Sequence, residues 1–166
     1  WVRRLLGSLD LSLGIVAVVA GRQRPRWPKA PRFAIPEQAL QYYLVDHLPT
    51  PGKGRIVRIY GAKTDNNAAQ FKEGQDQVLA PYIERGDITV IHEDWAEDWK
   101  PENAKRIVNA AITAQGTRFD AVLASNDGTA GGAVQALLEE GLAGRVLVTG
   151  QDAEVVALQR IAAGTQ

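Results

Sequence analysis

The stretch FDAVLASNDGTAGGAVQALLEEGLAGRVLVTGQD, residues 119–152, decides the fold class of this 166-residue chain. Its order of apolar and polar residues predicts a strand, a polar loop, a helix, a second strand and a second polar loop. In an open parallel sheet, ligands bind outside the carboxyl ends of the strands. We therefore expect Asn126, Asp127 and Asp152, which follow these two strands, to lie at the ligand-binding edge.

The same alternation of strands and helices extends through the preceding sequence. Strands are predicted at residues 55–61, 88–91, 121–124 and 146–149. Helices are predicted within residues 36–49, 67–85, 101–115 and 128–140, and a last helix is predicted to begin at Asp152. A period of about 30 residues and nearly continuous apolar strands are typical of βαβ units whose sheet is buried on both faces. The sequence therefore predicts an α/β fold, a Rossmann-like parallel sheet with helices on both faces.

The composition indicates a globular protein, and we expect no metal and no cofactor. Hydrophobic residues make up 45% and charged residues 23% of the chain, which is ordinary for a soluble domain. The longest apolar run, residues 11–20, is half of the roughly 20 residues that a membrane helix needs, so we expect no membrane insertion. The chain has no cysteine and two histidines, which excludes disulfides, thiolate chemistry and a histidine-rich metal site.

Charge divides the chain into two unlike parts. Residues 1–33 carry seven basic residues and one acidic residue, and the remainder carries twelve basic and eighteen acidic residues. Within the first part, GRQRPRWPKAPR contains three prolines, which disfavour both helices and central strands. We expect an atypical, irregular, basic segment at residues 1–35 and one α/β domain at residues 36–166. The apolar run upstream is consistent with a signal peptide or with a buried strand at residues 14–20. A short basic segment without a partner motif predicts no nucleic-acid partner.

Each predicted strand is followed by a loop that carries hydrogen-bonding or aromatic side chains. These are Asp65, Asn66, Asn67, Trp95, Trp99, Asn126, Asp127, Gln151 and Asp152. Carboxylates and carboxamides can form two hydrogen bonds at once, which suits the adjacent hydroxyls of a sugar. An indole face packs on the apolar face of a pyranose. The set predicts a carbohydrate site, although the same Asx residues also stand where helix N-caps are expected.

Other chemistries fit the sequence less well. The glycines at 128, 131 and 132 do not have the spacing of a dinucleotide fingerprint, and no Walker lysine follows them. The chain has no GxSxG motif and no plausible catalytic triad. We therefore expect no enzyme. A glycosidase that draws its carboxylates from Asp65, Asp127 and Asp152 is the enzymatic alternative to exclude.

Four segments resemble one protein family at the level of whole motifs: GAKTDNNA, WAEDWKPENA, DAVLASNDGTAGGAVQAL and VTGQDAEVVALQRIAAGTQ. They resemble the type I periplasmic binding protein superfamily, and within it the D-xylose-binding components of bacterial ABC sugar importers. The resemblance covers about residues 44–166. It implies two α/β lobes that close on a monosaccharide, a periplasmic location (lipid-anchored in some relatives), and the membrane subunits of an ABC importer as partners.

The resemblance also implies the sugar-binding residues. Motif by motif, they are Asp65, Asn67, Trp99, Asn126 and Asp152, with Trp95 as a less favoured stacking residue. Asp127 is then expected to cap the helix that follows it. In the family another lobe precedes the matched segment and a lysine ligand follows it. The chain therefore resembles one lobe, and we expect it to bind sugar weakly or not at all by itself.

The same fold also leaves a regulatory function open. The effector-binding domain of a sugar-responsive transcription regulator shares this architecture, but it requires a helix-turn-helix upstream. The basic segment before residue 35 has no such pattern. We therefore favour sugar transport over transcriptional regulation.

Overall fold

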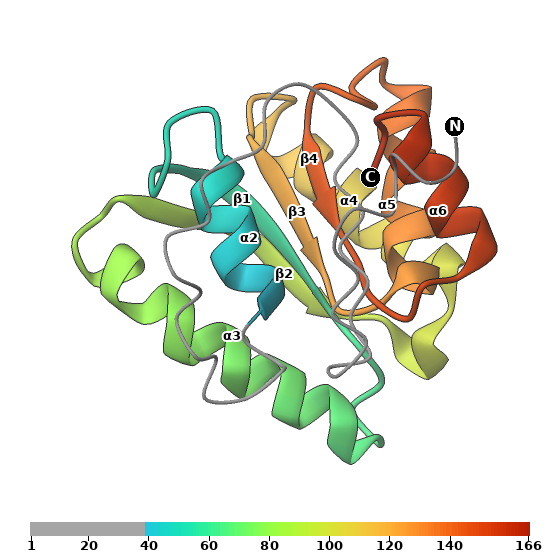
Figure 1. Cartoon of the computed structure of the whole chain (residues 1–166), viewed down its shortest axis with the longest axis horizontal. Coiled ribbons are helices and arrows are strands. Elements are labelled where there is room, and N and C mark those ends of the chain that lie inside the picture. The colour runs from blue at the N-terminus through green and yellow to red at the C-terminus, as the bar shows by residue number, and fades with distance from the viewer. Residues whose placement is uncertain (1–38) are drawn as a thin grey trace, which may run out of the picture.

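The computed structural model describes residues 39–166, which form a four-stranded parallel sheet with helices on both faces (Figure 1). The strands are β1 (Gly54–Tyr60), β2 (Ile88–Trp95), β3 (Ala121–Ala124) and β4 (Leu147–Thr149). Their order in the sheet is β2-β1-β3-β4, and all three pairs are parallel. The predicted α/β fold is confirmed. The expectations for residues 1–35 lie outside the described residues.

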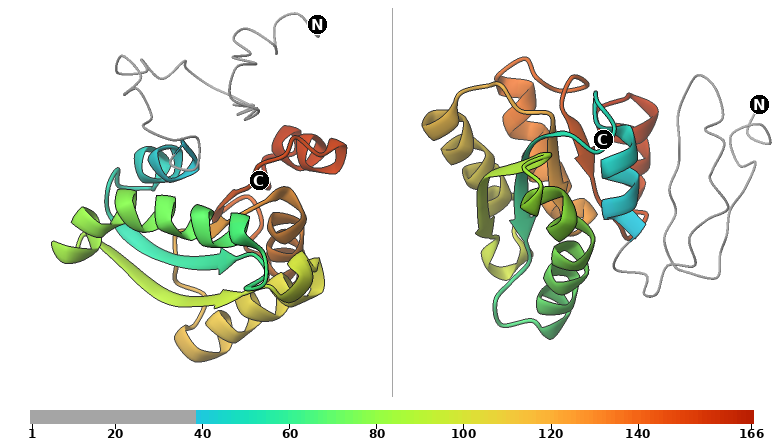
Figure 2. Two further views of the ribbon diagram at one scale, coloured as in Figure 1. Left: turned by 90° about the horizontal axis from the view of Figure 1, so that it is seen from below. Right: turned by 90° about the vertical axis from the view of Figure 1, so that its left-hand side faces the viewer.

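The helices separate into two layers around this sheet. They are α2 (Ala39–His47), α3 (Asn66–Glu84), α4 (Pro101–Gln115), α5 (Asp127–Glu139) and α6 (Val155–Ala162), with a short 3₁₀ helix, η3 (Glu97–Trp99). Figure 2 shows α2 and α3 on one face and α4 and α5 on the other, with α6 near the β4 edge. None of the helices within residues 39–166 combines the length and apolar character required to cross a bilayer.

The sheet has an apolar core on each face. Alternate residues of each strand are buried in one core or the other, because successive side chains in a strand point to opposite faces. On the α4–α5 face, Val57, Val122 and Val148 are buried among apolar residues of both helices. On the other face, Ile56 and Leu123 are buried against α2 and α3. This two-sided burial explains the continuous apolar runs that predicted the strands.

Two element boundaries differ from the sequence prediction by three residues or more. The polar residues after Ile91 predict a loop, but β2 continues to Trp95, which pairs with Tyr60 of β1. Within the described residues β2 is an edge strand, so its polar side chains remain solvated while its backbone gains hydrogen bonds from β1. The last helix was predicted to begin at Asp152, but α6 begins at Val155.

Candidate functional site

The strand order brings all the predicted loops to one edge of the sheet. Because the strands are parallel, the loops that follow them meet at the carboxyl edge in the order β2, β1, β3, β4. The predicted residues therefore succeed one another along this edge, from Trp99 through Asp65, Asn67 and Asn126 to Asp152. We call this set of five residues the rim.

Trp99 is held in one orientation by three neighbours. Its indole Nε1 donates a hydrogen bond of 3.0 Å to Asp65 Oδ2. The ring of Phe71 meets the indole edge-on, with 6.3 Å between ring centroids. A side chain at Gly61 would overlap the indole, so only glycine leaves room for it there. Trp99 also has a positive φ of 59°, which is uncommon for a residue with a side chain. The indole is therefore preorganised although it is only half buried.

Asp65 both caps α3 and orients Trp99. Its Oδ1 accepts a 2.8 Å hydrogen bond from the backbone N–H of Asn67, which makes Asp65 the N-cap. The sequence left Asp65 and Asn66 open as the cap, and the structure selects Asp65. Its Oδ2 faces the Trp99 indole. Each carboxylate oxygen can accept more than one hydrogen bond, so Asp65 retains capacity for a ligand hydroxyl. The neighbouring Asn67 is exposed in the first turn of the helix.

Asn126, not Asp127, is the N-cap of α5, which corrects the sequence prediction. The Asn126 backbone is extended, with φ −152°, and its Oδ1 accepts a 2.9 Å hydrogen bond from the backbone N–H of Thr129. The Thr129 side chain accepts from the Asn126 backbone N–H in return, which completes a capping box. The cap uses the carboxamide oxygen of Asn126, and its amide Nδ2 is the group left to donate to a ligand.

Asp127 is the first residue of α5 and is buried, with 3% of its surface exposed. Its Oδ2 accepts a 3.0 Å hydrogen bond from the backbone N–H of Glu154. Its Oδ1 accepts a 2.7 Å hydrogen bond from Nε2 of Gln166. Asp127 therefore contacts the β4–α6 loop, and its carboxylate is occupied by protein donors.

Asp152 lies in the loop between β4 and α6, where its φ of 100° is unusual for any residue other than glycine. This backbone conformation is the reason that α6 does not begin here. Although Asp152 is exposed, the pKa of its carboxyl is raised above the usual value. Partial desolvation is the main cause, and the nearby Asp127 carboxylate adds to it.

Trp95 lies at the end of β2 and contacts a different set of residues. Its ring is tilted against Tyr60, with 5.0 Å between centroids, and the Lys63 ammonium lies 6.0 Å from its ring centre. It is half buried. The direct hydrogen bond to Asp65 distinguishes Trp99 from Trp95.

A chain of buried hydrogen bonds, which the sequence did not predict, lies next to the rim residue Asn126. We call this chain the relay. Arg58 Nε donates to Gln75 Oε1 over 3.2 Å, and Gln75 Nε2 donates to Ser125 Oγ over 3.2 Å. The Ser125 hydroxyl donates in turn to the carbonyl of Ile59. The relay joins β1 and α3 to Ser125, the residue that follows β3 and precedes Asn126. One signal was present in the sequence: Arg58 interrupts the apolar run IVRIY at residues 56–60.

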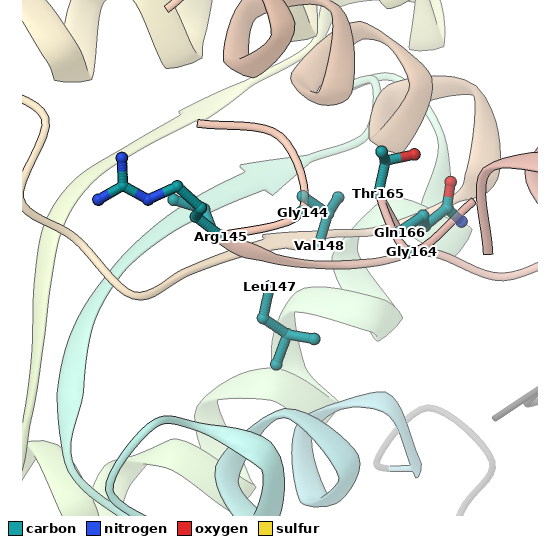
Figure 3. Close-up of a pocket in the computed structure, with 8 residues that line it drawn as sticks. Gly144, Arg145, Leu147, Val148, Gly164, Thr165 and Gln166 are labelled. Atoms are coloured by element: carbon teal, nitrogen blue, oxygen red, sulfur yellow. The ribbon is translucent and has the colours of Figure 1, made fainter. Parts of the chain in front are cut away.

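A small pocket lies elsewhere, beside β4 (Figure 3). Its volume is about 170 Å³, and its lining residues are Gly144, Arg145, Val146, Leu147, Val148, Gly164, Thr165 and Gln166. Ligand pockets usually measure about 300 Å³ or more. No rim residue lines this pocket, and the side chain of Leu147 extends toward α2 (Figure 3). We therefore place the candidate site at the rim. Residues 39–166 contain no cluster of three or more metal-ligating side chains.

Known proteins provide an independent comparison. The sequence pattern of the family described as "Periplasmic binding protein domain" matches residues 36–166. The chain belongs to this family. The D-xylose-binding periplasmic protein of Escherichia coli (strain K12) is 49% identical to this periplasmic binding protein domain over 123 residues, which are 74% of this chain and 36% of that protein. The corresponding protein of Haemophilus influenzae is 46% identical over 114 residues, which are 69% of this chain and 34% of that protein.

Solved structures agree with the sequence relatives. A periplasmic solute-binding protein from Actinobacillus succinogenes with bound D-allose superposes on 78% of this chain and 43% of its own, with a TM-score of 0.70 and 28% identity. The arabinose-binding component from Shewanella sp. ANA-3, bound to L-arabinofuranose, covers 78% and 42%, with a TM-score of 0.69 and 26% identity. The predicted family resemblance is confirmed. This periplasmic binding protein domain spans about a third of the length of the two curated relatives.

Proposed function

We propose that this domain binds a D-xylose-type monosaccharide at the rim, as part of the substrate-binding component of an ABC sugar importer. The observation that carries the proposal is the arrangement of the rim. A fixed indole, Trp99, lies at one end, and carboxylates and carboxamides follow it along the same edge. The relatives named as D-xylose-binding, at 49% and 46% identity, support this choice of sugar.

Each rim residue has a role that its environment supports. The Trp99 indole stacks on the apolar face of the sugar ring, because Asp65 holds it in one orientation. Asp65 and Asn67 hydrogen-bond to sugar hydroxyls at the β1 loop. Asn126 donates from its Nδ2, because its oxygen caps α5. Asp152 accepts from a hydroxyl, and the partial desolvation of its carboxylate strengthens that hydrogen bond.

We propose no catalytic activity. A glycosidase needs two carboxyl groups that flank the scissile bond. Both oxygens of the Asp127 carboxylate accept hydrogen bonds from the protein, so this group is poorly placed to act as nucleophile or acid, and Asp65 and Asp152 are the remaining pair that an assay of xyloside hydrolysis must test. The relatives described above are all named as binding proteins.

The functional unit that we propose is residues 36–166, which is the range matched by the family. The five rim residues all lie within this range. The proposed location is the periplasm or another extracytoplasmic site, since the two curated relatives are named as periplasmic. The proposed protein partners are the membrane subunits of an ABC importer. The proposal includes no cofactor and no nucleic acid.

The proposal is tested by titrating D-xylose into isotope-labelled chain and following its amide and indole resonances by NMR. We expect a dissociation constant in the millimolar range, because one edge alone leaves much of the sugar in water. The shifts should be confined to the rim. Trp99→Ala and Asp152→Asn should abolish them, whereas Asn109→Ala, at an exposed position of α4, should not. Absence of shifts at the rim, or release of product from a nitrophenyl xyloside, would contradict the proposal.

A further inference from the structure

We propose that Asp127 is a positioning residue that holds the β4–α6 loop so that Asp152 faces the ligand. The inference rests on the proposed function, because it gives Asp127 a role in the site that Asp152 serves. Asp127 itself touches no ligand in this scheme. It acts only through the loop.

Asp127 holds the loop on both sides of Asp152. On one side, the Asp127 backbone N–H donates a 2.9 Å hydrogen bond to the carbonyl of Gln151. On the other side, Asp127 Oδ2 accepts from the backbone N–H of Glu154 over 3.0 Å. The two residues between these anchors, Asp152 and Ala153, both have positive φ, 100° and 57°. Residues with side chains disfavour this conformation, so it persists only where the surroundings enforce it.

A second set of contacts holds Asp127 in place. Gln166 Nε2 donates to Asp127 Oδ1 over 2.7 Å, and Arg160 Nε donates to Gln166 Oε1 over 2.7 Å. Arg160 Nη2 also donates to the Asp127 carbonyl over 2.8 Å. The closeness of these groups requires Gly150, because a Cβ there would lie 2.5 Å from Asp127 Oδ1. Every polar atom of Asp127 thus has a partner, and α6 is tied to the start of α5.

The donor and acceptor pattern allows a test by exchange. In Asp127→Asn, the side chain has one oxygen and one NH₂ group in place of two oxygens. The NH₂ group must face either the Glu154 N–H or the Gln166 NH₂, so two donors meet and one hydrogen bond is lost. In Gln166→Glu, two carboxylates meet at the position of the present 2.7 Å hydrogen bond. In the double variant, the new amide at position 127 donates to the new carboxylate at position 166, whose second oxygen accepts from Arg160. All hydrogen bonds are then restored with donor and acceptor exchanged.

The experiment measures two quantities for the wild type, both single variants and the double variant. The first is the set of NMR chemical shifts of Asp152 and Ala153 without sugar. The second is the dissociation constant for D-xylose from NMR titration. Asp120→Asn is the matched control, because Asp120 also accepts a backbone hydrogen bond, from Arg55 over 2.8 Å, but at the opposite end of β3. Thermal unfolding of each variant is recorded alongside.

We expect each single variant to displace the Asp152 and Ala153 resonances and to weaken xylose binding about tenfold or more. The double variant should return both quantities toward wild type, and Asp120→Asn should lower the unfolding temperature without moving either. Unchanged Asp152 resonances in a folded single variant, or a double variant as impaired as the singles, would overturn the inference. If Asp127→Asn does not fold, Gln166→Glu and the double variant decide the question. A wild type that does not bind xylose would reject the proposed function, and the resonances would still test the positioning role.

Discussion

At the scale of single residues, the site depends on side chains that serve the fold and the proposed ligand together. Asp65 caps α3 with one oxygen and holds Trp99 with the other. Asn126 caps α5 with its oxygen and keeps its amide for other partners. Capping and ligand binding are therefore compatible roles for one Asx residue. Substitutions that change only one of the two side-chain atoms can therefore test helix capping and ligand binding separately.

Substitution of Asp65 should separate its two roles. Asp65→Asn keeps an oxygen to cap α3 but places an amide against the Trp99 indole N–H. Asp65→Ala loses both contacts. We expect only Asp65→Ala to lose about 1 kcal/mol of stability from the helix cap. Both variants should weaken xylose binding, because the indole is released.

Urea unfolding and the NMR signal of the Trp99 indole measure these two effects. Asp46→Asn, on an exposed position of α2, is the control. An Asp65→Asn variant that binds xylose as well as the wild type would show that the indole hydrogen bond does not contribute to binding.

The raised pKa of Asp152 predicts a pH-dependent effect of its removal. Burial and the Asp127 charge disfavour the ionised form in the folded state. The carboxyl therefore destabilises the fold at pH values above its folded pKa, and this penalty disappears below its unfolded pKa of about 3.9. Asp152→Asn should be more stable than the wild type at pH 7, and the difference should shrink as the pH falls toward 4.

Thermal unfolding across this pH range measures the effect, with xylose titration at pH 7 beside it. We expect the more stable variant to bind sugar less well, which is a common trade-off at binding sites. A stability difference that is independent of pH would contradict the assignment of the penalty to Asp152 ionisation.

At the scale of secondary-structure elements, buried polar contacts set the position of the helices relative to the strands. Arg58 has 4% of its surface exposed and forms an ion pair of 2.6 Å with Asp76 of α3. Burial by itself raises the pKa of Asp76, but the hydrogen bonds from Lys72 and Arg58 outweigh it and lower the pKa overall. The relay through Gln75 and Ser125 then links this pair to β3.

Removal of Gln75 should loosen these elements. Gln75→Ala leaves the hydrogen bonds from Arg58 Nε and to Ser125 Oγ unmade in a buried place, which should cost about 1–3 kcal/mol. Gln77→Ala, at an exposed position two residues along the same helix, should change stability by less than about 0.5 kcal/mol.

Urea unfolding of both variants measures the difference, and the Asn126 side-chain amide resonances report whether the rim also moves. Equal stability of the two variants would show that the relay does not stabilise the fold. A resonance shift at Asn126 in Gln75→Ala, but not in Gln77→Ala, would show that the contacts of α3 affect the position of Asn126 in the rim.

At the scale of the whole molecule, both layers of helices and all rim residues belong to residues 39–166. Two apolar cores, one on each face of the sheet, bury the strands. The family match begins at residue 36. The fold and the proposed site thus share one continuous segment, and residues 1–35 lie outside the matched range.

Deletion of residues 1–35 should therefore leave the domain intact. We expect the shortened chain to unfold at the same temperature as the full chain and to bind D-xylose with the same dissociation constant. Differential scanning calorimetry and NMR titration of the two chains provide the comparison. A lower unfolding temperature of the shortened chain would show that the proposed domain boundary is wrong.

The sequence by itself determined the α/β class, the positions of the strands and the edge where the polar loops gather. These follow from local patterns, because apolar runs about 30 residues apart and glycine or proline at element ends act within short stretches. The helix predicted at residues 101–115 is an example that the structure confirms, since α4 begins at Pro101 and ends at Gln115. The extension of β2 to Trp95 was missed, since its pairing with β1 outweighs the local polarity.

Only the tertiary structure decided how the rim is built. Asn126 and Asp127 are adjacent and both are typical caps, but backbone geometry makes Asn126 the cap. Asp127 instead accepts hydrogen bonds from Glu154 and Gln166, which lie 27 and 39 residues away in the chain. The positive φ of Asp152 likewise depends on those distant partners. Local sequence sets what each side chain can bond to, whereas the packing of distant segments decides which bonds form.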